Sequence, residues 1–221
     1  MTPLVVYGVS NNLVVKLVDA INRHTPTYQL KGFLSSPNDE PLTDVMGIPV
    51  LGGPDVVPAL LASEPELRFF CNVNYTPADM READALLARS GCTVVSLIHP
   101  GVDMAFATHG ANVALAEGTL VGPNVAIGNH VTCRMGSIIS HDVTIEDRVY
   151  IGPRVTVCGG ARLREGCDIG AGATILPRVT VGRHTIVGAG AVVTRDLPDG
   201  VTAVGVPARV LRSQGHPALP D

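Results

Sequence analysis

The sequence predicts an α/β N-terminal domain followed by an all-β domain built as a parallel β-helix. Two observations support this prediction. Residues 1–98 read as short buried strands alternating with amphipathic helices, the pattern of βαβ units around a parallel sheet. From Val113 to Asp196 an apolar residue instead recurs at every sixth position, which is a signature of a parallel β-helix. We therefore expect domains at 1–98 and 99–221, the second ending in a non-repeating C-terminal tail.

The N-terminal domain is expected to be small and Rossmann-like. Its first strand, around Leu4 to Tyr7, leads into a helix whose apolar residues have helical spacing. Strands and helices then continue to alternate along the chain. The expected strands cover 28–36, 66–74 and 92–99, and the expected helices cover 54–61 and 77–91, with the first helix at 10–24.

The six-residue period also predicts which side chains fill the second domain. Three hexads make one triangular coil of about 18 residues, and equivalent residues on adjacent coils lie roughly 4.8 Å apart. The third residue of each hexad is expected to point inward: Leu115, Val121, Ile127, Cys133, Ile139, Ile145, Ile151, Val157, Leu163, Ile169, Ile175, Val181, Val187 and Val193. An interior filled in this way leaves only the outer corners and faces, or the space between subunits, for a functional site.

Composition narrows the function further. The net charge is −4, aromatic residues are 4 % of the chain, and tryptophan is absent, which argues against a nucleic-acid-binding surface. The apolar runs are shorter than the roughly 18 residues of a membrane helix. The five cysteines are scattered and contain no CxxC pair, so we expect neither a disulfide framework nor a metal site, and a cytoplasmic protein.

One histidine interrupts the corner pattern beside an acid. His141 lies in "SIISHDVTIED" and is followed at once by Asp142. It is either a solvated corner residue or a general base, since histidine titrates near neutrality and a neighbouring carboxylate favours the protonated ring. Counting 18 residues on from His141 gives Gly159, which should stack beside it and whose N–H could face a developing oxyanion.

Two further features have both a structural and a functional interpretation. Ala171 and Ala189 are one coil apart, so they either suit a tight corner or line a smooth groove for a thin ligand such as pantetheine. The segment "YGVSNN" follows a strand and opens a helix, which is the geometry of a phosphate site. It lacks G-x-G-x-x-G, so an ordinary turn is an equally good interpretation.

The whole chain resembles the hexapeptide-repeat nucleotide-sugar acetyltransferases of the sialic-acid and bacillosamine type. The motifs that carry the resemblance are "VVYGVSNN", "KGFLSS", "IPVLGG", "SLIHPG", "SIISHDVTIED", "VTVCGGA", "DIGAGATILPRVTVG", "TIVGAGAVVTRDLPDG" and "AVGVPARV". The resemblance implies a left-handed β-helix, acetyl-CoA as co-substrate, and a homotrimer with active sites between subunits. It also implies N-acetylation of a nucleotide-linked amino sugar for surface-glycan (O-antigen type, lipopolysaccharide) biosynthesis.

The same resemblance assigns roles to individual residues. His141 matches the family's base, Asp142 the acid that supports it, and Gly159 the residue whose N–H contacts the acetyl carbonyl. The positions expected to contact coenzyme A are Tyr150, Gly159, Ala171 and Ala189, with Tyr150 replacing a histidine. The positions expected to bind the nucleotide sugar are Ser10, Asn11, Asn12, Ser35, Ser36, Asn72 and Asn74. Departures from the UDP-linked pattern among them favour GDP, with GDP-perosamine as the first choice.

Two other functions stay open from the sequence. A sugar O-acetyltransferase would use the same residues on a hydroxyl group, and a non-catalytic scaffold would bind the nucleotide sugar without transferring anything. A zinc hydratase on this fold needs three converging histidines, and the spacing of His130, His141 and His184 does not suit one.

Overall fold

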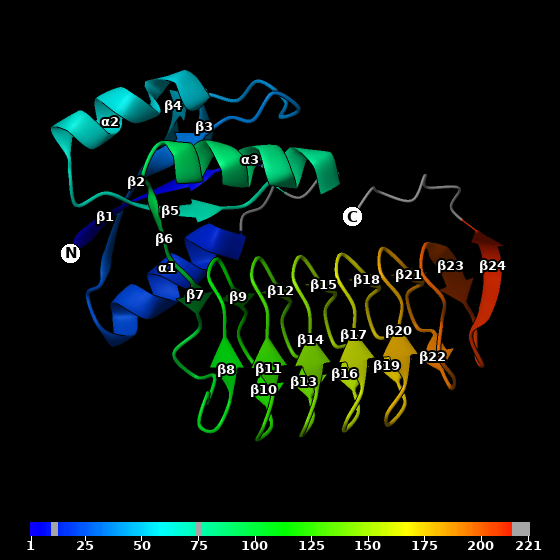
Figure 1. Ribbon diagram of the computed structural model, residues 1–221. Helices are drawn as coiled ribbons and strands as arrows, with labels where there is room; N and C mark the ends of the chain where they lie inside the picture. Colours follow the sequence, from blue (N-terminus) through cyan, green and yellow to red (C-terminus); the bar gives the residue numbers. More distant parts are fainter. Residues whose placement is uncertain (10–12, 74–76, 214–221) are drawn as a thin grey trace. The chain divides into compact units, whose positions relative to one another are not determined.

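The computed structural model describes residues 1–9, 13–73 and 77–213 (Figure 1). The chain divides into two compact units, Met1–Pro100 and Gly101–Asp221. Among the described residues, no helix has the length and apolar character needed to span a membrane.

The N-terminal unit is built on a six-stranded sheet with the order β3-β4-β2-β1-β5-β6. All its strand pairs are parallel except β3 with β4. The strands are β1 (Thr2–Tyr7), β2 (Tyr28–Leu34), β3 (Asp44–Val45), β4 (Ile48–Gly52), β5 (Arg68–Cys71) and β6 (Thr93–Val94). The helices are α1 (Leu13–His24), η1 (Pro54–Val56), α2 (Val57–Ser63) and α3 (Pro77–Arg89).

The helices and the sheet enclose an apolar core. Alternate residues of β1 and β5, such as Val5, Tyr7 and Phe69, are buried together with Leu34 of β2 and Leu87 of α3. Burying a side chain of this size contributes about 1.5–3 kcal/mol. The antiparallel hairpin β3–β4 was not expected from the sequence, because β3 has only two residues and gives no periodic signal.

The second unit is a parallel β-helix whose strands stack in three sheets (Figure 1). One face consists of β10 (Leu120–Val121), β13 (Ile138–Ile139), β16 (Thr156–Val157), β19 (Thr174–Ile175) and β22 (Val192–Val193). The next consists of β8 (Thr108–His109), β11 (Ala126–Ile127), β14 (Thr144–Ile145), β17 (Arg162–Leu163) and β20 (Thr180–Val181). The third contains β9 (Ala114–Leu115), β12 (Thr132–Cys133), β15 (Tyr150–Ile151), β18 (Asp168–Ile169), β21 (Ile186–Val187), β23 (Val201–Val204) and β24 (Arg209–Ser213), whereas β7 (Leu97–Ile98) lies within the residues of the N-terminal unit.

The hexad explains both the interior and the corners of these coils. The second residue of nearly every two-residue strand between β9 and β22 points inward and is buried, as predicted, with Val121 half-buried. The last residue of each hexad turns the corner with a positive φ, at every sixth position from Phe106 to Gly190. Glycine, Asn and Asp adopt this left-handed conformation most readily, which accounts for much of the composition there.

The coils stack in a constant register. From β8 to β22 every parallel pair between consecutive coils joins residues 18 positions apart, as in Ile139 with Val157 and Val157 with Ile175, and the spacing shortens to 16 where β23 pairs with β21. The predicted coil length is therefore confirmed, and equal corner positions lie directly above one another. The last coil is followed by the antiparallel pair β23–β24.

Candidate functional site

The three corners of the β-helix have different chemistry. The histidine corner comprises 122–124, 140–142, 158–160 and 176–178. The charged corner comprises 128–130, 146–148, 164–166 and 182–184. The alanine corner comprises 134–136, 152–154, 170–172 and 188–190. Each set is one column of turns along the helix axis.

The histidine corner holds a hydrogen-bonded His–Asp pair. The Nδ1 of His141 lies 2.7 Å from Oδ2 of Asp142, and the two side chains are 62 % and 57 % exposed in the single chain. A carboxylate only accepts hydrogen bonds, so Nδ1 carries the proton in this contact. In the neutral ring Nε2 then keeps its lone pair and is available to accept a proton.

Gly159 lies beside this ring on the next coil, as the coil count predicts. A Cβ added to Gly159 would lie 2.5 Å from Nε2 and 2.6 Å from Cε1 of His141, so only glycine leaves room for the ring in this position. Within the described part of the chain, the N–H of Gly159 donates to no protein acceptor, whereas its carbonyl accepts from Arg178. A base and a free N–H donor therefore lie next to each other at one corner.

Asn124 is a further residue at this corner that the sequence analysis did not single out. It lies 18 residues before Asp142, and its Nδ2 donates to Asp142 Oδ1 at 3.2 Å. The hydrogen bond from His141 and then the one from Asn124 lower the pKa of Asp142 from its ordinary value. The same coil count that relates His141 to Gly159 also relates Asn124 to Asp142, so the signal was present in the sequence.

Ala171 and Ala189 lie at the alanine corner, one above the other, and both are exposed. Gly152 and Gly170, each on the coil before one of these alanines, let adjacent coils approach closely. A Cβ on Gly152 would lie 2.8 Å from the N of Ala171. A Cβ on Gly170 would lie 2.5 Å from the N of Ala189. These glycines are therefore required by packing, and the smooth surface they leave is a consequence of that packing.

Tyr150 is half-buried in β15, in the strand that leads to the alanine corner. The structure places the two groups of predicted residues at opposite edges of the face formed by β10, β13, β16, β19 and β22. It brings His141, Asp142 and Gly159 together, and it brings Ala171 and Ala189 together, but the two groups occupy separate corners of one chain.

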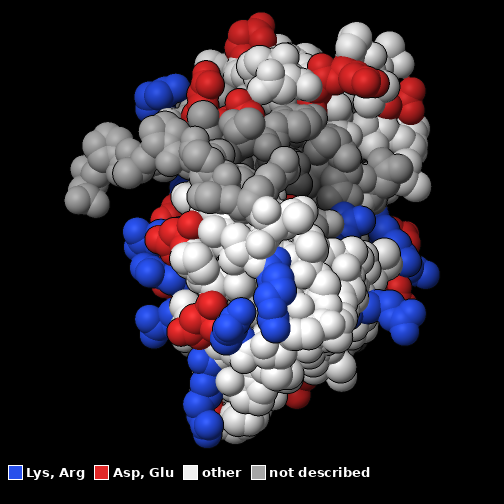
Figure 2. Space-filling model, turned by 90° about the vertical axis from the view of Figure 1, so that its right-hand side faces the viewer, with Lys and Arg blue, Asp and Glu red and all other residues white. Residues whose placement is uncertain are grey.

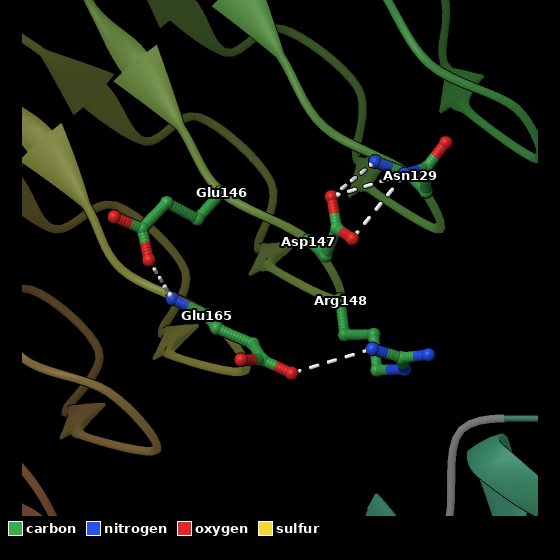
Figure 3. Close-up of polar contacts among 5 residues, drawn as sticks. All are labelled: Asn129, Glu146, Asp147, Arg148 and Glu165. Carbon is green, nitrogen blue, oxygen red and sulfur yellow. Dashed lines mark hydrogen bonds and ion pairs between the residues drawn. The ribbon is translucent and has the colours of Figure 1, made fainter. Parts of the chain in front are cut away.

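The charged corner has contacts between its own residues (Figure 3). Asp147 accepts from both the backbone and the side-chain nitrogens of Asn129, the backbone contact at 2.7 Å. Arg148 pairs with Glu165 at 3.3 Å, and Glu146 accepts from the N–H of Glu165 at 3.1 Å. These contacts tie consecutive coils together, so we assign this corner a structural role. Figure 2 shows charged side chains on both sides of this view, with a largely uncharged surface between them that Lys or Arg side chains interrupt near the middle.

The predicted nucleotide-binding residues of the N-terminal unit lie at one edge of its sheet. Ser35 and Ser36 follow β2, and Asn72 follows β5, on either side of the end of β1. Ligands of parallel sheets bind at such a switch point, outside the carboxyl ends of the strands. Ser35 donates through its Oγ to the carbonyl of Gly52 at 3.2 Å, and Asn72 contacts the carbonyl of Gly8 at 3.5 Å. Ser10, Asn11, Asn12 and Asn74 lie outside the described residues.

Asp39 is the residue at this edge that the sequence analysis missed. Its Oδ2 accepts from the N–H of Ser36 at 2.6 Å and from the N–H of Val9 at 3.2 Å. The side chain of Ser36 is buried, and its Oγ has no hydrogen-bond partner among the residues that the structure describes. Asp39, three residues after Ser36, therefore supplies a carboxylate close to the predicted serines at this edge.

Comparisons with known proteins support the predicted resemblance. Residues 142–176 and 160–195 match the model of the bacterial transferase hexapeptide (six repeats). No curated protein sequence matches the chain significantly. Several solved structures cover nearly the whole chain. PerB from Caulobacter crescentus, in complex with CoA and GDP-perosamine, is 28 % identical, covers 94 % of this chain and 96 % of its own, and has a TM-score of 0.82.

The second is the acetyltransferase domain of PglB from Neisseria gonorrhoeae FA1090, in complex with acetyl coenzyme A. It is 27 % identical, covers 95 % of this chain and 99 % of its own, and has a TM-score of 0.84. WeeI from Acinetobacter baumannii AYE, at 24 % identity with coverages of 96 % and 100 % and a TM-score of 0.78, shares the fold. The resemblance to hexapeptide-repeat nucleotide-sugar acetyltransferases is thereby confirmed.

Proposed function

We propose that this chain, which carries bacterial transferase hexapeptide repeats, transfers an acetyl group from acetyl-CoA to the amino group of a nucleotide-linked amino-deoxy sugar. The first choice of acceptor is the 4-amino group of GDP-perosamine, for surface-glycan biosynthesis of the O-antigen type. The likeness to PerB and to the PglB domain supports the reaction class. We also propose that the β-helix is left-handed and that residues 1–98 form a Rossmann-like domain.

The single observation that carries the proposal is the geometry of the histidine corner. The His141 ring lies against Gly159, and among the described residues neither Nε2 of His141 nor the N–H of Gly159 has a protein hydrogen-bond partner. Acyl transfer to an amine needs these two groups: an acceptor for the amine proton, and a donor for the oxygen that becomes negative in the tetrahedral intermediate.

The proposed steps follow from these atoms. The sugar nitrogen attacks the thioester carbon while the N–H of Gly159 donates to the carbonyl oxygen, a contact worth roughly 3 kcal/mol in comparable sites. Nε2 of His141 takes the proton that the nitrogen loses, and Asp142 holds the resulting imidazolium through Nδ1. The C–S bond then breaks, and the proton passes to the departing thiolate. A positioned base of this kind gives about 10²- to 10⁴-fold in rate.

Acetyl-CoA is proposed to lie against the alanine corner, where Ala171 and Ala189 leave a smooth exposed column. Because this corner and the histidine corner lie at opposite edges of one face, we propose that a second copy of the chain brings them together in a homotrimer. The face between them is suited to contact with another copy, since its outward residues carry no charge. Leu120 and Ile138 of this face are 60 % and 42 % exposed in the single chain.

The carboxyl edge of the N-terminal sheet is proposed to bind the nucleotide through Ser35, Ser36 and Asn72, with Asp39 beside them. A carboxylate at this edge is unfavourable for phosphate and favourable for N–H and O–H groups. We therefore propose that this edge binds the base and the ribose of the nucleotide, and GDP is favoured because guanine presents several N–H donors on one side.

The experiment is a thiol-release assay with acetyl-CoA and a panel of GDP-, UDP- and dTDP-linked amino sugars. Turnover of GDP-perosamine above the others supports the proposal, and failure of every amino sugar to release thiol contradicts it.

Matched 4-hydroxy sugars in the same panel separate N-acetylation from O-acetylation. The proposal expects turnover of the amine and little of the hydroxyl, since a hydroxyl is the weaker nucleophile. Calorimetry with acetyl-CoA and with the nucleotide sugar distinguishes a transferase from a non-catalytic scaffold. Binding of the nucleotide sugar without any binding of acetyl-CoA would instead indicate a scaffold that carries no transfer chemistry.

A further inference from the structure

Asn124 completes a chain of hydrogen bonds that ends at the candidate base. The Asp142 carboxylate uses Oδ2 for His141 Nδ1 at 2.7 Å and Oδ1 for Asn124 Nδ2 at 3.2 Å. Because a carboxylate offers only acceptors, the part of the Asn124 amide that faces it must be the NH₂ group. Asp142 is therefore held from both of its oxygens, by two residues on adjacent coils.

The backbone of the same turn supports this arrangement. The N–H of Asp142 donates to the carbonyl of Pro123 at 3.0 Å, so the turn containing Asn124 and the turn containing Asp142 are fixed to each other. A Cβ on Gly122 would lie 2.8 Å from the N of His141, which shows how closely the two turns pack. Asn124 thus contacts Asp142 from a rigid position, and its hydrogen bond in the described part of the chain goes to Asp142 and not to the His141 ring.

From this geometry we propose that Asn124 is a positioning residue: its amide fixes the Asp142 carboxylate, and Asp142 in turn fixes the orientation and tautomer of His141. The inference rests on the proposed acetyl transfer and adds a residue to it. A single hydrogen bond leaves an exposed carboxylate free to rotate about its terminal bond. A second donor on the other oxygen removes that freedom, and the proton on Nδ1 keeps the lone pair of Nε2 directed toward Gly159.

Backbone conformation is the competing explanation for asparagine at this position. Asn124 has φ 59° and Asp142 has φ 58°, in the left-handed region where asparagine and glycine are favoured. Glycine occupies the equivalent corner position at Gly118, Gly136 and Gly160, among others, so this fold accepts glycine there. Asn124→Gly therefore removes the amide while keeping the turn, which separates the two explanations.

A second variant isolates the donor. Asn124→Asp has nearly the same shape and also tolerates the left-handed conformation, but it replaces the NH₂ group with an acceptor that faces a carboxylate. We expect it to be at least as impaired as Asn124→Gly at neutral pH, because two carboxylates then repel each other. The matched control is Phe106→Gly, one coil earlier in the same column, where φ is 61° and the side chain is 85 % exposed.

The first measurement is steady-state kinetics with the full chain, acetyl-CoA and the acceptor identified by the panel. Loss of a group that orients a metal-bound histidine costs about 10- to 100-fold, and we expect the loss of the amide that orients Asp142 to act at the lower end of that range. We expect kcat to fall by about tenfold in both Asn124 variants, with KM for acetyl-CoA little changed and with Phe106→Gly close to the parent. Parent-like kcat in Asn124→Gly would overturn the proposal.

The second measurement needs no substrate. Imidazole ¹⁵N NMR, with the His141 signal identified from its loss in His141→Ala, reports which ring nitrogen carries the proton. The parent is expected to show the Nδ1–H tautomer, and Asn124→Gly a mixture of the two tautomers. An unchanged tautomer in Asn124→Gly would refute the positioning role, even if no acceptor sugar were turned over. A changed tautomer in a protein that releases no thiol would support the positioning role and contradict the proposed activity.

Discussion

Gly159→Ala is the sharpest test of the histidine corner, because it adds one methyl group at the point where the ring lies. The new Cβ would lie 2.5 Å from Nε2 and 2.6 Å from Cε1 of His141. Nonbonded carbon and nitrogen atoms normally remain about 3.5 Å apart, so the ring must move by about 1 Å. The φ of Gly159 lies outside the left-handed region, so alanine itself is not strained there.

A displacement of this size should affect catalysis far more than folding. A misplacement of about 1 Å in a reacting group can cost about 10²-fold in rate. The ring is the exposed end of a flexible side chain and can move into solvent, so the loss of stability should stay within about 0.5 kcal/mol. We expect kcat in the thiol-release assay to fall by about 10²-fold, with a melting temperature within about 3 °C of the parent.

The control is Gly159→Ala combined with His141→Ala, in which the imidazole ring is absent. If the methyl group acts by displacing His141, then Gly159→Ala should add little to the loss already caused by His141→Ala, because two changes that act through one contact are not additive. A Gly159→Ala enzyme within twofold of the parent would show that the position of the ring does not matter for the reaction. Full additivity in the double variant would show that the methyl group acts elsewhere.

Three other predictions concern the core, the acid and the alanine corner. Ile151→Ala removes a side chain that is fully buried inside the coil, so unfolding should become easier by about 2–5 kcal/mol, measured by denaturant titration. The pKa of Asp142 lies below its ordinary value, so its contacts favour the folded state at neutral pH and lose that effect as the pH falls through the lowered pKa. His141→Ala removes the larger cause and should raise that pKa toward the ordinary value, as followed by carboxyl ¹³C NMR. Ala189→Phe should raise KM for acetyl-CoA and leave KM for the sugar little changed, whereas an unchanged KM for acetyl-CoA would exclude this corner as its site.

The β-helix could be predicted almost completely because one period determines all of it. An aliphatic residue at every sixth position specifies the inward side chains, the corners between them and the 18-residue coil. Ile139, Val157 and Ile175 therefore stack as the count requires. The N-terminal unit has no such period, and each element had to be inferred from its own short pattern. A two-residue strand such as β3 gives no pattern, which is why the β3–β4 hairpin was missed.

The candidate site was predictable where its residues are related by whole coils. His141 and Gly159 differ by one coil, and the structure places them side by side. Asp39 is related to Ser36 and Val9 only through a loop, and no spacing rule indicates that its carboxylate reaches both backbone N–H groups. Loop side chains of this kind can be found only from coordinates.

The six-residue period also determines which of the predicted site residues can share a corner of one chain. His141 and Ala171 are 30 positions apart, which is one coil of 18 and two hexads of six, so they cannot share a corner. His141 and Gly159 are 18 apart and must share one. The predicted base and the predicted coenzyme A groove are therefore separated in any single chain with this period, whatever its side chains.

It follows that a monomeric variant of this protein should bind acetyl-CoA at the alanine corner yet fail to transfer the acetyl group. Replacing exposed Leu120 with Asp should test this by weakening contact between copies: loss of thiol release together with loss of the oligomer in analytical ultracentrifugation would fit, and full activity in a monomer would refute a site shared between copies.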